Sequence, residues 1–210
     1  MTLFLNILEL FGTVAFALSG AMVGIQKRLD LLGVVFLGVV TAVGGGVLRD
    51  LMIGVTPPRC FQDPVYLLVA CAASLLFFLP FLRRPLMRHE KTFDRFLFTT
   101  DSLGLAVFTV SGVQAGYASS PSFGPVRLVF IGMLTGTGGG VLRDILADET
   151  PYIFQKHVYA TASLAGAVLF VVCHRLNANW YVSWLASIGL VFLIRCLASH
   201  YKWNLPRATE

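Results

Sequence analysis

Hydrophobic residues in this chain are gathered into seven long runs, and polar residues are confined mainly to the short segments between them. The runs cover residues 3–25, 31–53, 65–82, 96–117, 126–146, 157–173 and 180–197. About 20 apolar residues in a helix span the hydrocarbon core of a bilayer, so this pattern predicts seven transmembrane helices. The predicted fold class is an all-α integral membrane protein, with residues 1–210 forming a single membrane domain.

Basic residues are distributed unequally between the two ends of the predicted helices. The first, third and fifth connections and the C-terminal tail hold Lys27, Arg28, Arg83, Arg84, Arg88, Lys91, Arg95, Lys156, Lys202 and Arg207. The second, fourth and sixth connections hold only Arg59, Arg127 and Arg175. Cytoplasmic loops of membrane proteins are enriched in Lys and Arg. We therefore expect a multi-pass protein with its N-terminus outside and its C-terminus in the cytoplasm.

The composition agrees with a membrane protein and argues against several other classes. Charged residues make up 13% of the 210 residues, whereas soluble domains carry about 25%. The net charge of +5 is explained by the loop asymmetry, so nucleic acid is not an expected partner. The four cysteines lack metal-ligand spacing, and the sequence holds no recognisable catalytic motif. We expect no enzyme activity, no catalytic residues, no cofactor and no fixed metal site.

An internal repeat divides most of the chain into two units. Residues 41–50 match residues 135–144, and both copies end in Gly-Gly-Gly-Val-Leu-Arg-Asp. Each unit contains three predicted spans, an odd number, so the second unit enters the membrane from the opposite side. The prediction is two inverted three-helix repeats, over residues 3–88 and 95–175. A seventh helix over residues 180–198 then serves as a scaffold.

Three consecutive glycines lie about two-thirds of the way along the second and fifth predicted helices. They are Gly44, Gly45 and Gly46 in the first copy and Gly138, Gly139 and Gly140 in the second. Consecutive glycines weaken a helix and permit a bend, and a bend at membrane depth must be lined by protein or water. One interpretation is a kink that lines a pore, which the matched depth favours. The other is close helix packing through small residues.

Each glycine triplet is followed by an ionisable pair, and ionisable groups inside a span indicate function by default. The polar candidates are Arg49, Asp50, Arg143 and Asp144, with Glu9, Asp101, Ser19 and Ser111 on the preceding helices. Similar depths along the helix axes predict that Glu9 pairs with Arg49 and Asp101 with Arg143. Asp50 and Asp144 would then face a lumen. A structural ion pair that locks helices together is the alternative interpretation, and it is compatible with a role in permeation.

The doubled motif and the layout of three, three and one helices resemble the trimeric intracellular cation channel family. The resemblance is greatest to its bacterial branch, also labelled a glycine transporter domain. It implies a homotrimer in the bacterial inner membrane, with a pore for K⁺ or Na⁺ in each protomer. The kinked second and fifth helices would line this pore with the first and fourth, and the charges named above would line or gate it. In animal relatives a lysine at the position of Arg143 is tied to phosphoinositide binding. This chain departs from them by carrying an arginine, which keeps the charge, in a bacterial setting that generally lacks that lipid. Membrane lipids are expected as partners without an assigned headgroup.

Two other functions stay open at this point. A broken helix offers amide groups to a carboxylate and carbonyl groups to an ammonium, which suits a carrier for a small zwitterion such as glycine. A scaffold without transport activity is the third. Residue types alone do not separate the channel from the carrier, whereas electrical recording of the purified protein in a bilayer does.

Overall fold

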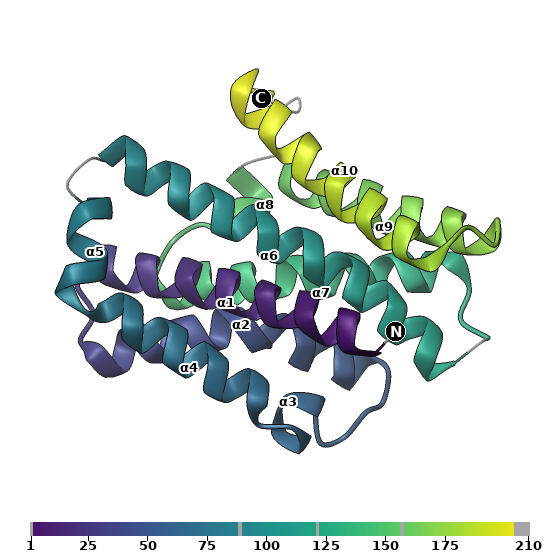
Figure 1. The fold of residues 1–210 in the computed structure, drawn as a ribbon, viewed down its shortest axis with the longest axis horizontal. Helices are drawn as coiled ribbons and strands as arrows, with labels where there is room; N and C mark the ends of the chain where they lie inside the picture. The colour runs from purple at the N-terminus through teal and green to yellow at the C-terminus, as the bar shows by residue number, and fades with distance from the viewer. Residues whose placement is uncertain (1, 88–89, 121, 156–157, 204–210) are drawn as a thin grey trace, which may run out of the picture.

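A computed structural model describes residues 2–87, 90–120, 122–155 and 158–203. Every regular element within these ranges is an α-helix (Figure 1). The helices are α1 (Thr2–Gln26), α2 (Leu31–Met52), α3 (Arg59–Gln62), α4 (Val65–Phe78), α5 (Pro80–Met87), α6 (Glu90–Ser119), α7 (Pro125–Leu146), α8 (Tyr152–Gln155), α9 (Val158–Arg175) and α10 (Trp180–His200). Four positions used above lie outside the described residues: Arg88, Lys156, Arg207 and the start of the sixth predicted span at His157. The side chain of Arg84 lies outside them as well.

Six of the described helices are long and apolar enough to cross a membrane. They are α1, α2, α6, α7, α9 and α10, with lengths from 18 to 30 residues. These six correspond to six of the predicted spans, which confirms the all-helical membrane class. The fourth predicted span is longer than expected, because α6 begins at Glu90 and carries the helix through the polar segment before residue 96.

The third predicted span, residues 65–82, is wrong as a single helix. Its helix, α4, ends at Phe78 after 14 residues, and Leu79 has an extended backbone (ψ 131°). Pro80 then begins α5. The break has a local cause, because a proline disfavours the helical conformation in the residue before it. Fourteen residues rise only about 21 Å, less than the hydrocarbon core of about 30 Å.

The long helices are arranged as two similar sets that face each other. α1 packs against α2 and α4, while α6 packs against α7 and α9. The two sets meet where α1 contacts α6 and α2 contacts α7. Figure 1 shows α1 and α6 running in opposite directions, with α10 lying along α9 and α6 at the outer edge. The repeated motif therefore lies at the centre of the molecule, on α2 and α7.

The glycine triplets allow α2 and α7 to cross with their backbones in direct contact. A Cβ atom on Gly45 would overlap the carbonyl oxygen of Thr135, and one on Gly139 would overlap that of Thr41. Both helices are continuous α-helix through the triplets. Glycine is needed here because the backbones touch where a side chain would otherwise lie. Close packing, the second interpretation of the triplets, is what these contacts display.

Candidate functional site

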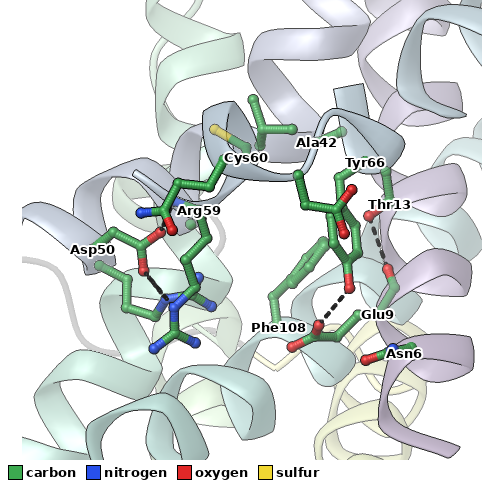
Figure 2. A pocket seen from close by; sticks show the side chains of 14 residues that line it. Asn6, Glu9, Thr13, Ala42, Asp50, Arg59, Cys60, Tyr66 and Phe108 are labelled. Carbon is green, nitrogen blue, oxygen red and sulfur yellow. Dashed lines mark hydrogen bonds and ion pairs between the residues drawn. The ribbon is translucent and has the colours of Figure 1, made fainter. Parts of the chain in front are cut away.

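A polar cavity of about 360 Å³ opens beside α3, and we call it the α3 cavity. Its walls come from α1, α2, α3, α4 and α6. They include Asn6, Glu9, Thr13, Ala42, Val43, Gly46, Arg49, Asp50, Arg59, Cys60, Gln62, Asp63, Tyr66 and Phe108. Figure 2 shows the side chains of Glu9 and Tyr66 facing each other on one side, with Asp50 and Arg59 together on the other. Three candidate residues from the sequence, Glu9, Arg49 and Asp50, therefore line one space, together with Gly46.

Glu9 is held in this cavity by hydroxyl groups. The Tyr66 hydroxyl donates to Glu9 Oε2 over 3.0 Å, and the Ser111 hydroxyl of α6 donates to Glu9 Oε1. Among the described residues, no ion pair joins Glu9 to a basic side chain. The predicted pair of Glu9 with Arg49 is therefore wrong. Equal depth on two helices did not bring the two side chains together, because their rotation about the helix axes also decides the contact.

Asp50 is buried and fully engaged, with 1% of its side chain exposed. Its Oδ1 accepts from Arg49 Nε over 2.9 Å, and its Oδ2 accepts from the backbone N–H of Arg59 over 2.8 Å. Asp144 has the matching contacts in the second copy, with Arg143 Nε at 2.8 Å and the backbone N–H of Tyr152 at 2.9 Å.

The prediction that Asp50 and Asp144 are left without a basic partner is therefore wrong, although Asp50 still lines the α3 cavity. That prediction rested on the roughly 100° that separates neighbouring residues around a helix. A long arginine side chain bridges that angle by folding back along its own helix. Each aspartate then uses its second oxygen to accept from the first residue of the short helix that follows, which is α3 in one repeat and α8 in the other.

The second copy of the motif builds a buried charge cluster, which we call the Asp101 cluster: Asp101, Arg143, Asp144 and Arg195. Arg143 Nη1 donates to Asp101 Oδ1 over 2.7 Å, which confirms that predicted pair. The same nitrogen donates to Ser19 of α1 over 2.5 Å. One side chain from α7 thereby joins α1 and α6, and it is only 1% exposed. The space between these three helices is closed at this level.

Arg195 of α10 is the residue that sequence reasoning missed. Its Nη2 lies 3.3 Å from Asp101 Oδ2, and its guanidinium lies 4.7 Å from the centre of the Tyr159 ring. A signal was available, because Arg195 is an ionisable residue inside the apolar run 180–197. Tyr66 and Tyr159 were also missed, although they occupy equivalent positions in the two repeats. Each contacts the acidic residue of its own repeat, Glu9 or Asp101.

The two repeats therefore present equivalent residues in opposite states. In the first, Glu9 lines an open cavity, and its donors among the described residues are hydroxyl groups. In the second, Asp101 is neutralised by two arginines in a site with no exposed member. The serines cross between repeats, because Ser111 of the second reaches Glu9 and Ser19 of the first reaches Arg143. The difference arises from two contacts: Arg143 reaches Asp101 whereas Arg49 pairs with Asp50, and α10 supplies a second arginine to Asp101, with no equivalent beside Glu9 in the part of the chain that the structure describes.

Cys60 of the short helix α3 lines the α3 cavity outside the long apolar helices. Its partial burial, and then the negative charge of Asp50, raise the pKa of the Cys60 thiol above its ordinary value. The thiolate form is therefore scarce at neutral pH, and Cys60 is a probe of access to this cavity rather than a reactive group.

Comparison with known proteins shows which family has this sequence and this fold. A family model described as "Glycine transporter" matches residues 6–81 and 98–175. A membrane protein of Deinococcus radiodurans is 47% identical over 78% of this chain and 73% of its own length. An inner membrane protein of Escherichia coli is 34% identical over 95% of this chain and 93% of its own. The crystal structure of the trimeric intracellular cation channel orthologue from Rhodobacter sphaeroides has a TM-score of 0.86 and 35% identity, covering 95% of this chain and 98% of that one.

This chain belongs to the bacterial branch of the trimeric intracellular cation channel family. The two stretches matched by the family model coincide with the two predicted repeats and contain Glu9, Asp101 and both arginines of the motif. They end at residue 175 and leave α10 outside. In this channel-family member, Arg195 therefore joins the shared core from a helix that the family model does not cover.

Proposed function

We propose that this protein is a channel for monovalent cations, K⁺ or Na⁺, with one pore inside each protomer of a homotrimer. The pore runs between α1, α2, α6 and α7. Cations enter it through the α3 cavity, and the Asp101 cluster closes it at the other end. The cation channel structures that this chain resembles support the proposal, and the positions of the charged residues decide its details.

The observation that carries the proposal is the carboxylate of Glu9, which has no basic partner among the residues that the structure describes. The α3 cavity is lined by three acidic residues, Glu9, Asp50 and Asp63, and two basic ones, Arg49 and Arg59. Asp50 lies against both arginines, at 2.9 and 3.9 Å. Glu9 is left with hydroxyl donors, which orient a carboxylate and leave its negative charge in place. A charge held this way in a water-accessible cavity attracts cations.

The closed end of the pore is formed by Arg143. Its guanidinium reaches from α7 to Ser19 and Asp101, and it places a positive charge in the path of a cation. Opening requires this side chain to leave Ser19 and Asp101, for which Asp144 offers a second acidic partner at 2.8 Å. Arg49 has the equivalent place at the entrance, where it rests on Asp50 beside the cavity. In this scheme Arg143 gates the pore and Glu9 recruits the ion.

Gly46 gives the glycine triplet a second role in the pore. Whereas Gly45 meets the backbone of α7, a Cβ on Gly46 would have only Arg49 Nη2 nearby, at 3.7 Å. Gly46 thus lines the α3 cavity, and because it has no side chain it leaves the cavity wider at this point. In the proposed pore one glycine of the triplet sets the helix crossing and the next sets the width of the lumen, and any kink that accompanies gating is expected at this point.

The arrangement in the membrane follows from the same repeat. We propose one membrane domain over residues 1–210 with inverted repeats, since equivalent helices α1 and α6 run in opposite directions (Figure 1). α4 supplies the seventh crossing despite its length, with flanking residues completing the span. The N-terminus then lies outside the inner membrane and the C-terminus in the cytoplasm, as the Lys and Arg distribution predicts. Membrane lipids and two further copies of the chain surround each protomer.

The test is electrical recording of the purified protein in planar bilayers, paired with uptake of labelled glycine into vesicles. Unitary currents carried by K⁺ and Na⁺, with reversal potentials that follow the cation gradient, are the expected result. Arg143→Gln should raise the fraction of time spent open, because it removes the bridge to Ser19 and Asp101. Saturable glycine uptake without unitary currents would replace the channel with the carrier suggested by the description of the family model.

A further inference from the structure

A separate cavity of about 230 Å³ lies where α10 ends, with mainly apolar walls and two basic side chains, and we call it the α10 cavity. Arg195, Ser199, Lys202 and Trp203 line it from α10 and the turn that follows, and Phe98 closes it from α6. Two of the described lining residues are basic and none of them is acidic. The cavity shares no lining residue with the α3 cavity, so it is not part of the proposed pore entrance.

The end of α10 folds back to complete this cavity. The backbone N–H of Trp203 donates to the carbonyl of Ala198 over 3.0 Å, and Lys202 takes a left-handed conformation with φ 53°. This hydrogen bond and the left-handed residue are those of a Schellman turn. The turn reverses the chain and brings Lys202 and Trp203 next to Ser199 at the cavity. The basic group from the C-terminal side is therefore placed by backbone geometry.

Arg195 offers unused donors to the cavity. A guanidinium has five N–H groups. Nε donates to Ser102 Oγ over 3.2 Å and Nη2 to Asp101 Oδ2 over 3.3 Å, while Nη1 has no acceptor among the described residues. The rings of Phe98 and Tyr159, at 4.9 and 4.7 Å from the guanidinium carbon, hold the group in position. The side chain is 4% exposed and lines the cavity, so its remaining donors are shielded from bulk water and available to a group bound there.

We propose that the α10 cavity binds a phosphate group, carried either by a lipid headgroup or by a soluble phosphate compound. An arginine fork and a lysine ammonium supply the charge-assisted hydrogen bonds that phosphate oxygens accept, and the Ser199 hydroxyl adds a neutral donor. The volume corresponds to about eight water molecules, which accommodates a phosphate and the first atoms attached to it. Basic pockets between membrane helices on the cytoplasmic side bind such headgroups, and the proposed topology places Lys202 there.

Binding at this cavity acts on the Asp101 cluster through a shared residue. Arg195 contacts Asp101 from the same guanidinium that faces the cavity. A bound phosphate competes with Asp101 for the Arg195 guanidinium. If Arg195 moves toward the phosphate, Asp101 is left with Arg143 as its basic partner among the described residues. The site is thus connected to the charge that closes the proposed pore without lying in the ion path.

Lipid retention tests the site directly. The full-length protein is reconstituted in phosphatidylcholine containing a minor fraction of phosphatidylglycerol, and the lipid retained per protomer is counted by native mass spectrometry. Wild type should retain phosphatidylglycerol in preference to phosphatidylcholine. Lys202→Gln should lower that retention on the order of tenfold, the value of one charge-assisted hydrogen bond. Arg195→Lys keeps the charge beside Asp101 but loses the fork, and should also lower retention.

The matched control is Lys91→Gln, which removes the same charge from an exposed position at the start of α6. It should retain phosphatidylglycerol as wild type does, because Lys91 does not line the cavity. Inorganic phosphate added at constant ionic strength identifies the source. Displacement of the retained lipid means that the cavity also takes free phosphate, and no displacement means that it requires the lipid headgroup.

Two results would overturn the proposal. One is an equal loss of phosphatidylglycerol in Lys202→Gln and Lys91→Gln. The other is a wild type that retains no excess phosphatidylglycerol and binds no inorganic phosphate in equilibrium dialysis. Neither measurement depends on ion flux, so this site is tested independently of the channel.

Discussion

Removing the Asp101 carboxylate should strand the arginine of α10 and not the arginine of the repeated motif. Arg143 lies 2.7 Å from Asp101, but it also has Asp144 at 2.8 Å. Arg195 has Asp101 as its acidic partner, and no other ion pair of Arg195 is found in the part of the chain that the structure describes. After Asp101→Asn, Arg143 therefore keeps a carboxylate, while Arg195 is a buried charge without one.

The expected cost is that of breaking a buried ion pair from one side, about 3–5 kcal/mol. For a chain of this size that corresponds to a fall in Tm of roughly 6–20 °C, measured by thermal unfolding of the purified protein in detergent. Adding Arg195→Gln to Asp101→Asn should recover part of this loss, because the stranded charge is removed. Adding Arg143→Gln instead should recover nothing, because it leaves Asp144 as well as Arg195 without an oppositely charged partner.

Lys27→Gln is the control for the loss of an ion pair as such. Lys27 lies 3.0 Å from Glu149, and both side chains are more than one-third exposed. A pair of this kind contributes about 0–1 kcal/mol, so Tm should change by no more than about 4 °C. If Arg143→Gln rescued Asp101→Asn better than Arg195→Gln did, the assignment of partners within the Asp101 cluster would be refuted.

Three further predictions concern the α3 cavity. Glu9→Gln should reduce K⁺ conductance several-fold at 0.01–0.1 M salt and little at 1 M, because the Debye length falls from roughly 30–10 Å to about 3 Å. If the variant and the wild type conducted equally at every salt concentration, Glu9 would be excluded as the recruiting charge. Glu90→Gln is the control. Gly45→Ala should abolish folded protein on size-exclusion chromatography, because its Cβ meets the Thr135 carbonyl. Gly46→Ala should assemble normally and lower single-channel conductance. If Gly46→Ala failed to assemble and Gly45→Ala assembled normally, the assignment of Gly46 to the cavity wall would be wrong. In a variant lacking the other three cysteines, the rate of maleimide labelling of Cys60 should rise about tenfold per pH unit from pH 7 to 9. Burial raises the pKa of this thiol, and only its thiolate reacts. A labelling rate independent of pH would contradict the raised pKa of Cys60.

Much of the fold could be predicted from the sequence because membrane insertion depends on composition along the chain. Apolar length alone identified six helices that the structure describes, and the repeated motif located the centre of the molecule on α2 and α7. The pair of Asp101 with Arg143 was also predictable, because depth along two helix axes can be calculated from residue number. The exception was α4, where a single proline at position 80 ended the helix early.

The rest required the tertiary structure, because depth does not give rotation about a helix axis or the choice of neighbouring helix. Glu9 and Arg49 lie at similar depths, yet Glu9 contacts Tyr66 and Ser111 while Arg49 turns back to Asp50. The repeat predicts equal roles for Glu9 and Asp101. Two tertiary contacts separate them: Arg143 reaches Asp101 whereas Arg49 turns back to Asp50, and α10 adds Arg195 to Asp101. One end of the molecule is therefore an open acidic cavity and the other a closed, neutral cluster.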